Sequence, residues 1–264
     1  MSGRDVGASS YRERNSTADR ALDILGMFSD DRPVLSGATV AADLGVAKST
    51  AYRYLQSLVV GRFLEEAPGG GFRLGLRVLE LARLARRTYG LSDVALPTME
   101  KLAAAVHETV LLTRRVGDLV VCVERAESQT HRVRISYERG STLPINAGAS
   151  ALVLLAWIPP AEAETVLRAN PLRRFTPATL TDVDKLLLRL KQIRNDGYSI
   201  SSSEVDNGVL GVAAPIFDDT GAVVAGVSVA AVSSRTSEEA KASIIREVLA
   251  AGAEITERVR VVQS

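Results

Sequence analysis

Gly45 separates two short apolar runs that both have helical spacing, and this arrangement limits the fold of the first part of the chain more than any other feature. A glycine between two helices allows the tight turn that lets the second helix cross the first. The first run, residues 37–44, places its apolar side chains on one side. In the second run, residues 47–60, one face carries Ala47, Ala51, Tyr54, Leu55 and Leu58. Two crossed helices of this kind predict a helix-turn-helix.

Signals on both sides of this pair extend it to a larger module. Ser16 can cap a preceding helix, which ends before the sequence Asp-Asp-Arg-Pro at residues 30–33. Residues 62–66 and 72–74 predict two short strands, joined by the turn sequence Ala-Pro-Gly-Gly-Gly. The order helix, helix, turn, helix, hairpin predicts a winged helix-turn-helix over residues 16–75.

The polar side of the helix at residues 47–60 contains no acidic residue. A helix face that only needs solvent usually mixes Glu with Lys, whereas an acid-free face can approach phosphates. Lys48, Ser49 and Thr50 stand at the helix N-terminus, where free N–H groups and the helix dipole favour anions. Side chains farther along can reach base edges in a major groove of DNA. The expected DNA contacts of the helix and the hairpin are Lys48, Ser49, Thr50, Tyr52, Arg53, Gln56, Gly70 and Arg73.

Leucine side chains cover more than one side of the next helical run, residues 76–90. Such a helix must bury its apolar area against another surface. Packing against the same helix of a symmetry mate would bury this area, and it would hold two DNA-binding modules at a fixed distance. We therefore expect residues 76–90 to form a linker helix in a homodimer.

From residue 91 on, helical and strand patterns alternate. The helical patterns lie at residues 91–106, where Pro97 is expected to kink the helix or mark a fresh start, at residues 150–157, from a cap at Thr181 to Gly197, and after a cap at Ser237. The strand patterns lie at residues 109–115, 119–124, 133–136, 198–201, 209–217 and 223–232. Strand pairs interrupted by helices predict an antiparallel sheet with helices on its faces. The predicted fold class is α+β with two domains, the second at residues 91–264.

Length and composition agree with a two-domain protein that has no membrane contact. A chain of 264 residues is long for one compact domain and comfortable for two. No segment approaches the ~20 uncharged apolar residues of a membrane span, and residues 1–15 lack the apolar core of a signal peptide. We expect these residues to be a flexible tail and the protein to be cytoplasmic. The single cysteine, Cys122, lies in an apolar run and is expected in the core, without a disulfide.

Several segments together resemble one known family. They are Ala-Asp-Arg-Ala-Leu-Asp-Ile-Leu at residues 18–25, Leu-Gly-Val-Ala-Lys-Ser-Thr-Ala-Tyr-Arg-Tyr-Leu at 44–55, Leu-Pro-Ile-Asn-Ala-Gly-Ala-Ser at 143–150, Asp-Gly-Tyr at 196–198, Glu204, and Gly-Val-Ala-Ala-Pro-Ile-Phe-Asp at 211–218. In this order they resemble the IclR (isocitrate lyase regulator) type of bacterial transcription factor. The resemblance implies a winged helix on a linker helix, a GAF-like effector domain, and dimers or dimers of dimers on palindromic double-stranded operator DNA.

The resemblance also implies an effector site in the second domain. It places the effector between the loop at Ala149 and Ser150 and the sheet near Leu210, Gly211 and Ser228. Backbone N–H groups at the start of a helix can receive a carboxylate, so we expect a small organic acid, with aromatic acids included. The remaining expected contacts are the apolar walls Ile135 and Leu143, and Ser201 and Glu204 in a polar stretch that closes over the ligand.

An enzyme is the main alternative class, with Ser150, His131 and Asp206 as a catalytic triad. The sequence contains no Gly-x-Ser-x-Gly motif, no phosphate-binding glycine loop and no His/Cys spacing typical of metal sites. Both histidines, His107 and His131, lie singly in polar surroundings, which is typical of solvent-exposed positions. We expect no catalytic residue, no metal and no cofactor. A second alternative is a winged helix that binds a protein partner through its hairpin and Arg53.

Overall fold

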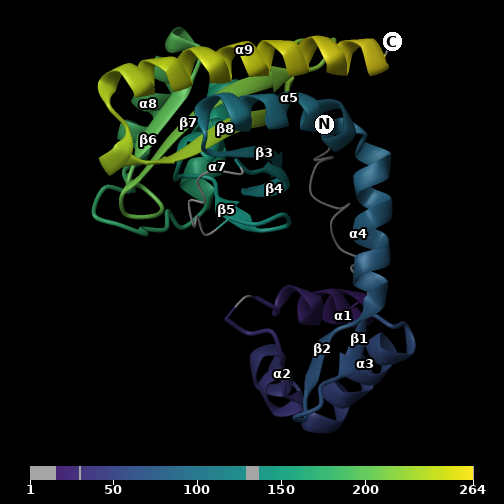
Figure 1. Cartoon of the computed structure of the whole chain (residues 1–264). Helices are drawn as coiled ribbons and strands as arrows, with labels where there is room; N and C mark the ends of the chain where they lie inside the picture. Colours follow the sequence, from purple (N-terminus) through teal and green to yellow (C-terminus); the bar gives the residue numbers. More distant parts are fainter. Residues whose placement is uncertain (1–15, 30, 129–136, 264) are drawn as a thin grey trace, which may run out of the picture. The chain divides into compact units, whose positions relative to one another are not determined.

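The computed structural model describes residues 16–29, 31–128 and 137–263, and the chain divides into two compact units between Thr88 and Tyr89 (Figure 1). The predicted tail at residues 1–15, the predicted strand at 133–136, and His131 and Ile135 therefore lie outside the described residues. Each unit is described by itself below.

The first unit has the predicted order of helices and strands. It contains α1 (Ser16–Gly26), α2 (Gly37–Leu44), α3 (Lys48–Val60), β1 (Leu64–Glu66), β2 (Phe72–Leu74) and most of α4 (Leu76–Tyr89). The Ser36 hydroxyl caps α2 by accepting a hydrogen bond from the Thr39 N–H at 3.0 Å. Gly45 ends α2 with φ at 63°, a left-handed conformation that favours glycine and lets α3 turn across α2. The core between the helices contains Ile24, Val40, Ala51, Leu55 and Phe72.

The hairpin after α3 is a wing of two short antiparallel strands, in which Leu64 pairs with Leu74. Its first strand begins later than residue 62, because Arg62 has φ at 60° and cannot continue an extended strand. Leu35 adds a backbone bridge to Phe72, with N–H to oxygen distances of 2.9 and 2.8 Å. The wing is thereby tied to the segment that leads into α2.

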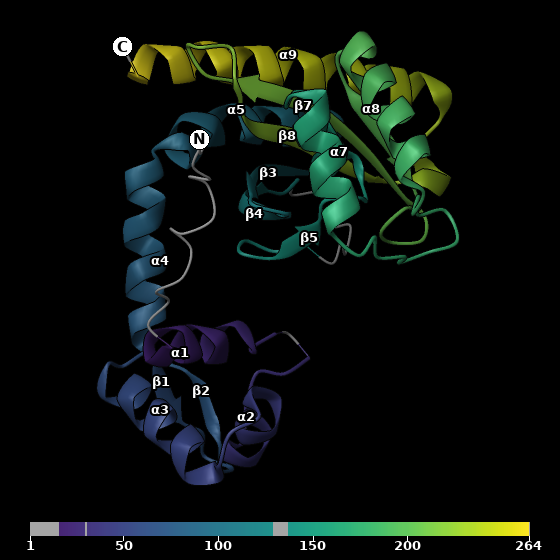
Figure 2. The ribbon, with the colours of Figure 1, turned by 180° about the vertical axis from the view of Figure 1, so that it is seen from behind.

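The second unit contains a six-stranded antiparallel sheet in the order β5-β4-β3-β8-β7-β6. The strands are β3 (Thr109–Val116), β4 (Leu119–Ala126), β5 (Thr142–Pro144), β6 (Ser199–Ser202), β7 (Val209–Phe217) and β8 (Val223–Val232). One face is covered by α5 (Leu91–Val106) and α9 (Glu238–Gln263), and the other by α6 (Ala149–Ala156), with α7 (Pro160–Ala169) and α8 (Val183–Asp196) packed on it (Figure 2). The predicted α+β class is confirmed.

Side chains of β7 alternate between the two faces and so divide the interior into two apolar clusters. Leu210, Val212 and Ile216 pack in the cluster with α5 and α9. Ala213 belongs to the opposite cluster, with α6, α7 and α8. This alternation decides which residues of β7 can reach the head of α6.

Four local expectations for this unit have clear outcomes. The prediction that Thr181 caps α8 is wrong, because the Asp182 carboxylate accepts the Lys185 N–H at 3.0 Å while the Thr181 hydroxyl accepts a hydrogen bond from Arg174. The predicted caps at the other ends are confirmed: Gly197 ends α8 with φ at 83°, and the Ser237 hydroxyl accepts the Ala240 N–H. Helix α5 continues through Pro97, and the fresh start comes earlier, at Gly90.

Candidate nucleic-acid interface and ligand cavity

Helix α3 has one buried face and one exposed face. Ala51, Leu55 and Leu58 are buried against the rest of the first unit. The exposed side chains are Lys48, Ser49, Tyr52, Arg53 and Gln56, and Thr50 is half-buried beside them. The predicted division of this helix is confirmed except at Ala47, which is exposed because it precedes the helix as its N-cap. Ala47 offers no side-chain cap, so the N-terminus of α3 is open to an anion.

Ion pairing distinguishes the cations of α3 from other cations of the first unit. Arg20, Arg32, Arg73 and Arg77 each lie within ion-pair distance of a carboxylate, at 3.9, 2.8, 2.7 and 2.8 Å respectively. Among the described residues, Lys48 and Arg53 have no such carboxylate partner. Two uncompensated cations on one exposed face create a local positive potential, although the whole chain has a net charge of only +1.

Tyr52 lies on this face but is also fixed to its neighbours. Its ring contacts the Phe72 ring edge to face, with centroids 6.1 Å apart. A methyl group at Gly37 would lie 2.5 Å from Cε2 of Tyr52, so the ring rests directly on the first residue of α2. Tyr52 is still 48% exposed. It therefore connects α3 to α2 and the wing while it presents one edge to solvent.

The two wing residues expected at DNA differ in their availability. Gly70 is exposed at the tip with φ at 89°. Arg73 is exposed as well, but its Nε lies 2.7 Å from a carboxylate oxygen of Glu65 on the paired strand. A phosphate would have to compete with Glu65 for Arg73, so this arginine is less available to DNA than Lys48 and Arg53 of α3.

A cavity of about 50 Å³ lies at the N-terminal end of α6, between this helix and the sheet. It brings together seven of the residues predicted to contact an effector, namely Leu143, Ala149, Ser150, Ser201, Glu204, Gly211 and Ser228. Ser150 and Ser228 are buried, and their hydroxyl oxygens are 2.8 Å apart. The convergence of hydroxyl groups at a small hollow makes this the candidate ligand site.

Hydrogen bonds from side chains occupy the first N–H groups of α6. The Gly148 N–H donates to Oε2 of Glu204 at 3.2 Å, and the Ala149 N–H donates to Oγ of Ser201 at 3.0 Å. The other carboxylate oxygen of Glu204 pairs with Arg189 at 2.5 Å. The Ala149 amide is therefore not vacant, and the expected N–H contact to a ligand carboxylate would have to displace Ser201.

Leu210 does not line this cavity, so its predicted place in the apolar wall is wrong. It belongs to the cluster with α5 and α9, on the opposite face of β7 from its neighbour Gly211. Successive residues of a strand point to opposite faces, so adjacent residues of β7 cannot both face α6.

Tyr137 lines the cavity and was not among the predicted residues. Its ring packs against the cluster around α6 and against a smaller cluster that contains Leu111, Cys122 and Ala230. Burial, together with the charge of Asp206, raises the pKa of the Tyr137 hydroxyl above its usual range, so the group stays protonated. The sequence around Tyr137 has no periodicity that points to α6, and only the tertiary fold brings the two together.

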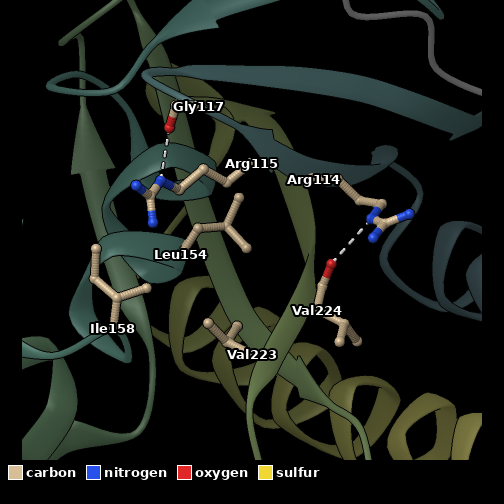
Figure 3. Close-up of a pocket in the computed structure, with 7 residues that line it drawn as sticks. All are labelled: Arg114, Arg115, Gly117, Leu154, Ile158, Val223 and Val224. Carbon is tan, nitrogen blue, oxygen red and sulfur yellow. Dashed lines mark hydrogen bonds between the residues drawn. The ribbon is translucent and has the colours of Figure 1, made fainter. Parts of the chain in front are cut away.

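A larger hollow of about 370 Å³ lies elsewhere in the second unit, between the β3–β4 turn, the end of α6 and the start of β8 (Figure 3). Leu154, Ile158 and Val223 form its apolar side. The Arg115 guanidinium beside them donates to the Gly117 carbonyl at 2.8 Å and to Glu162 at 2.7 Å. None of the predicted site residues lines this hollow.

The residues of the alternative catalytic triad do not form a described triad. The Ser150 hydroxyl bonds to Ser228, and Asp206 lines the same cavity, but His131 is outside the described residues. His107 is exposed at the end of α5. Within the described ranges, no group of three or more His, Cys, Asp or Glu side chains is arranged to hold a metal ion. In the same ranges, no helix is both long and apolar enough to cross a membrane.

Comparison with known proteins gives matches over both units. The family described as IclR helix-turn-helix domain matches residues 17–68, and the family described as bacterial transcriptional regulator IclR C-terminal matches residues 85–257. The HTH-type transcriptional regulator KipR of Bacillus subtilis is 30% identical over 248 residues, which cover 94% of this chain and 98% of KipR.

Two solved structures are similar over nearly the whole chain. A protein of Silicibacter sp. TM1040 assigned to the IclR regulators has a TM-score of 0.83 at 29% identity and covers 92% of this chain and 96% of its own. An IclR homolog of Microbacterium hydrocarbonoxydans, solved in complex with 4-hydroxybenzoate, has a TM-score of 0.78 at 28% identity, with 93% of this chain and 99% of its own covered.

Proposed function

Because the chain belongs to the IclR family of bacterial transcriptional regulators, we propose that it binds operator DNA through α3 and that a small organic acid bound at the head of α6 controls this binding. The observation that carries the proposal is the exposed face of α3, on which Lys48 and Arg53 have no carboxylate partner in the described part of the chain. Because a bacterial operator lies in the cytoplasm, the proposal also assigns the protein to that compartment.

In this proposal the exposed face of α3 enters the major groove. The open N-terminus of α3, with Lys48, Ser49 and Thr50, meets phosphates, because N–H groups and hydroxyls there can donate to phosphate oxygens. Arg53 and Gln56, farther along, reach base edges, where a bidentate contact contributes about 1–3 kcal/mol of discrimination. Gly70 brings the wing tip close to the DNA backbone without a side chain in the way.

We propose that α4 is a dimer interface. Leu76 and Leu79 are 67% and 65% exposed, and Leu81 and Leu84 are exposed as well. Exposed leucines on more than one side of a helix are stable in water when another surface, here a second copy, covers them. Two α3 helices in a homodimer, or in a dimer of dimers, would meet half-sites about 34–36 Å apart or a multiple of that distance.

The effector acts by linkage in this proposal. A ligand that binds one arrangement of the dimer more tightly than another shifts the population towards that arrangement, and so changes the fit of two α3 helices to their half-sites. Organic acids are supported as ligands by the relative solved with 4-hydroxybenzoate and by the buried Ser150 and Ser228 hydroxyls. Repression and activation both fit this scheme.

Fluorescence anisotropy with labelled DNA from the promoter beside the protein's own gene tests the proposal. Tight binding that weakens steeply with added salt, and that unrelated DNA does not compete away at equal concentration, is the expected result. Absence of such binding would favour the alternatives, an enzyme or a protein-binding winged helix. The same titration with a panel of metabolite acids tests the linkage, because an effector must change the operator Kd.

A further inference from the structure

The cavity at the head of α6 is too small for an aromatic acid in its observed form. Its volume is about 50 Å³. An engineered protein cavity that binds benzene has roughly 150 Å³. One water molecule needs on the order of 10–15 Å³, so the cavity has room for about four water-sized groups. This space corresponds to about two or three carbons with their oxygens, and not to a ring with two substituents.

Among the described residues that line the cavity, Tyr137 has the largest side chain. It packs against both apolar clusters that border the space, with Leu111 and Val209 on one side and Val205 on the other. Its backbone is held in place, because the Arg125 guanidinium donates to the Tyr137 carbonyl at 2.9 Å. The Tyr137 ring therefore takes up space beside the cavity that removal of the ring would open.

The wall of the cavity at the head of α6 has little freedom to give way. Ser201, Gly211 and Ala149 are in close contact there, since a methyl group at Gly211 would lie 2.7 Å from Oγ of Ser201 and 3.2 Å from Cβ of Ala149. Glu204 at this end is buried and held by Arg189 and the Gly148 N–H. Enlargement at the head of α6 would break these contacts, whereas enlargement at Tyr137 needs only one side chain.

We propose that Tyr137 sets the upper size limit of the effector, so that the cavity takes an acid of about two or three carbons and excludes an aromatic one. The carboxylate or hydroxyl of such an acid meets the buried Ser150–Ser228 hydroxyl pair, and its short chain ends at the Tyr137 ring. This inference rests on the proposed function, and it narrows the organic acid to a short-chain class.

Calorimetry on the full chain with 4-hydroxybenzoate, p-cresol and L-lactate as probes tests the size limit. The Tyr137→Ala variant should bind 4-hydroxybenzoate at least tenfold more tightly than the wild type, and p-cresol, which contains the same hydroxyphenyl ring as the one removed, should raise its Tm. Tyr198→Ala is the matched control, because Tyr198 is also half-buried but packs in the cluster with α5 and α9. This control should bind 4-hydroxybenzoate as the wild type does.

Two results would overturn the size limit. One is a wild-type protein that binds 4-hydroxybenzoate as tightly as Tyr137→Ala does. The other is a Tyr137→Ala protein whose affinity for 4-hydroxybenzoate and p-cresol is no higher than that of the wild type. If Tyr137→Ala does not fold, Tyr137→Val gives the same comparison with less volume lost.

Operator binding, measured in parallel, separates this inference from the proposed function. If Tyr137→Ala binds 4-hydroxybenzoate and its operator Kd then changes with this ligand, the size limit and the proposed function are both supported. If the ligand binds and the operator Kd stays constant, the size limit stands and the linkage between ligand and DNA is wrong.

Discussion

Lys48 and Arg53 differ from other cations of the first unit in what surrounds them. Arg20 and Arg32 lie beside Asp23 and Asp43, so much of their charge is already balanced. An exposed ion pair contributes little stability, usually about 0–1 kcal/mol, but it does reduce the attraction of a cation for another anion. An unpaired cation retains that attraction, and for this reason we assign the phosphate and base contacts to α3.

The contact between Gly37 and Tyr52 predicts coupling between these two positions. A methyl at Gly37 would lie 2.5 Å from Cε2 and 2.8 Å from Cζ of Tyr52, so Gly37→Ala must push the ring away. Overpacking of this kind typically costs about 1–3 kcal/mol, and the half-exposed ring keeps the cost near the lower end. Melting curves by circular dichroism should show a lower Tm for Gly37→Ala and a smaller loss when Tyr52→Leu is already present. Strictly additive effects in this double-mutant cycle would contradict the contact.

Burial of Cys122 predicts a specific pH dependence of stability. The side chain is fully buried in the core, as predicted, and burial raises the pKa of its thiol from 9.0 to about 11. The neutral thiol is favoured in the folded state, so its contribution is fully present below about pH 9 and is lost as the pH rises towards 11. The free energy of unfolding of the wild type should fall in this range by up to about 1.4 kcal/mol per pH unit more than that of Cys122→Ala. Parallel curves from urea denaturation of the two proteins would contradict the assignment.

Local spacing predicted the properties that depend on one element alone. The 3.6-residue period places Arg53 and Gln56 on the side of α3 away from Ala51 and Leu58, and both are exposed, as is Lys48 at the start of the helix. Tyr137 could not be predicted, because its place at the cavity depends on how β4 and the following chain fold back towards α6. Leu210 was misassigned because the sequence of β7 is apolar on both faces, and such a run gives no alternation from which to choose the side chains that face α6.

Helix α4 is the element whose surface is least suited to water. Its apolar positions spread over more than one side, and the exposed leucines include Leu76, Leu79, Leu81 and Leu84. The sequence predicted the helix and its need for a partner surface, but a single chain does not contain that partner. The predicted ranges of α2, β7 and β8 agree with the structure to the residue. Gly45 directly follows α2, Gly208 directly precedes β7, and the turn that contains Gly221 precedes β8, so turn residues in the sequence delimit each of them.

Removal of leucines from α4 should weaken self-association. We expect Leu76→Ser with Leu79→Ser to shift the protein towards monomer in sedimentation velocity, because the apolar area that a second copy would cover is lost. Val116→Ser is the matched control, since Val116 is a comparably exposed apolar residue, at 63%, on the β3–β4 hairpin of the second unit. Unchanged sedimentation of the double variant would show that α4 is not the interface.

Across the whole molecule, the account joins a DNA-binding unit, a helix that pairs two copies, and a ligand-binding unit. Each part depends on one physical feature: positive charge on α3, exposed apolar area on α4, and a small polar cavity at α6. Regulation arises only if ligand and DNA each prefer one arrangement of the dimer, and the coupling must then be equal in both directions. Such coupling is typically about 1–3 kcal/mol, so an effector should change the operator Kd by roughly 5- to 150-fold.

The most direct test of the central claim is the operator affinity of a Lys48→Ala/Arg53→Ala variant, measured by anisotropy at several salt concentrations. The account predicts a loss of at least about 100-fold, with a salt dependence of log Kd that is shallower by about one for each phosphate contact removed per subunit. Arg20→Ala/Arg32→Ala, which removes two cations that are paired in the same unit, should change the affinity little. If the first variant folds, as judged by circular dichroism, and still binds the operator like the wild type, α3 does not read DNA and the account is wrong.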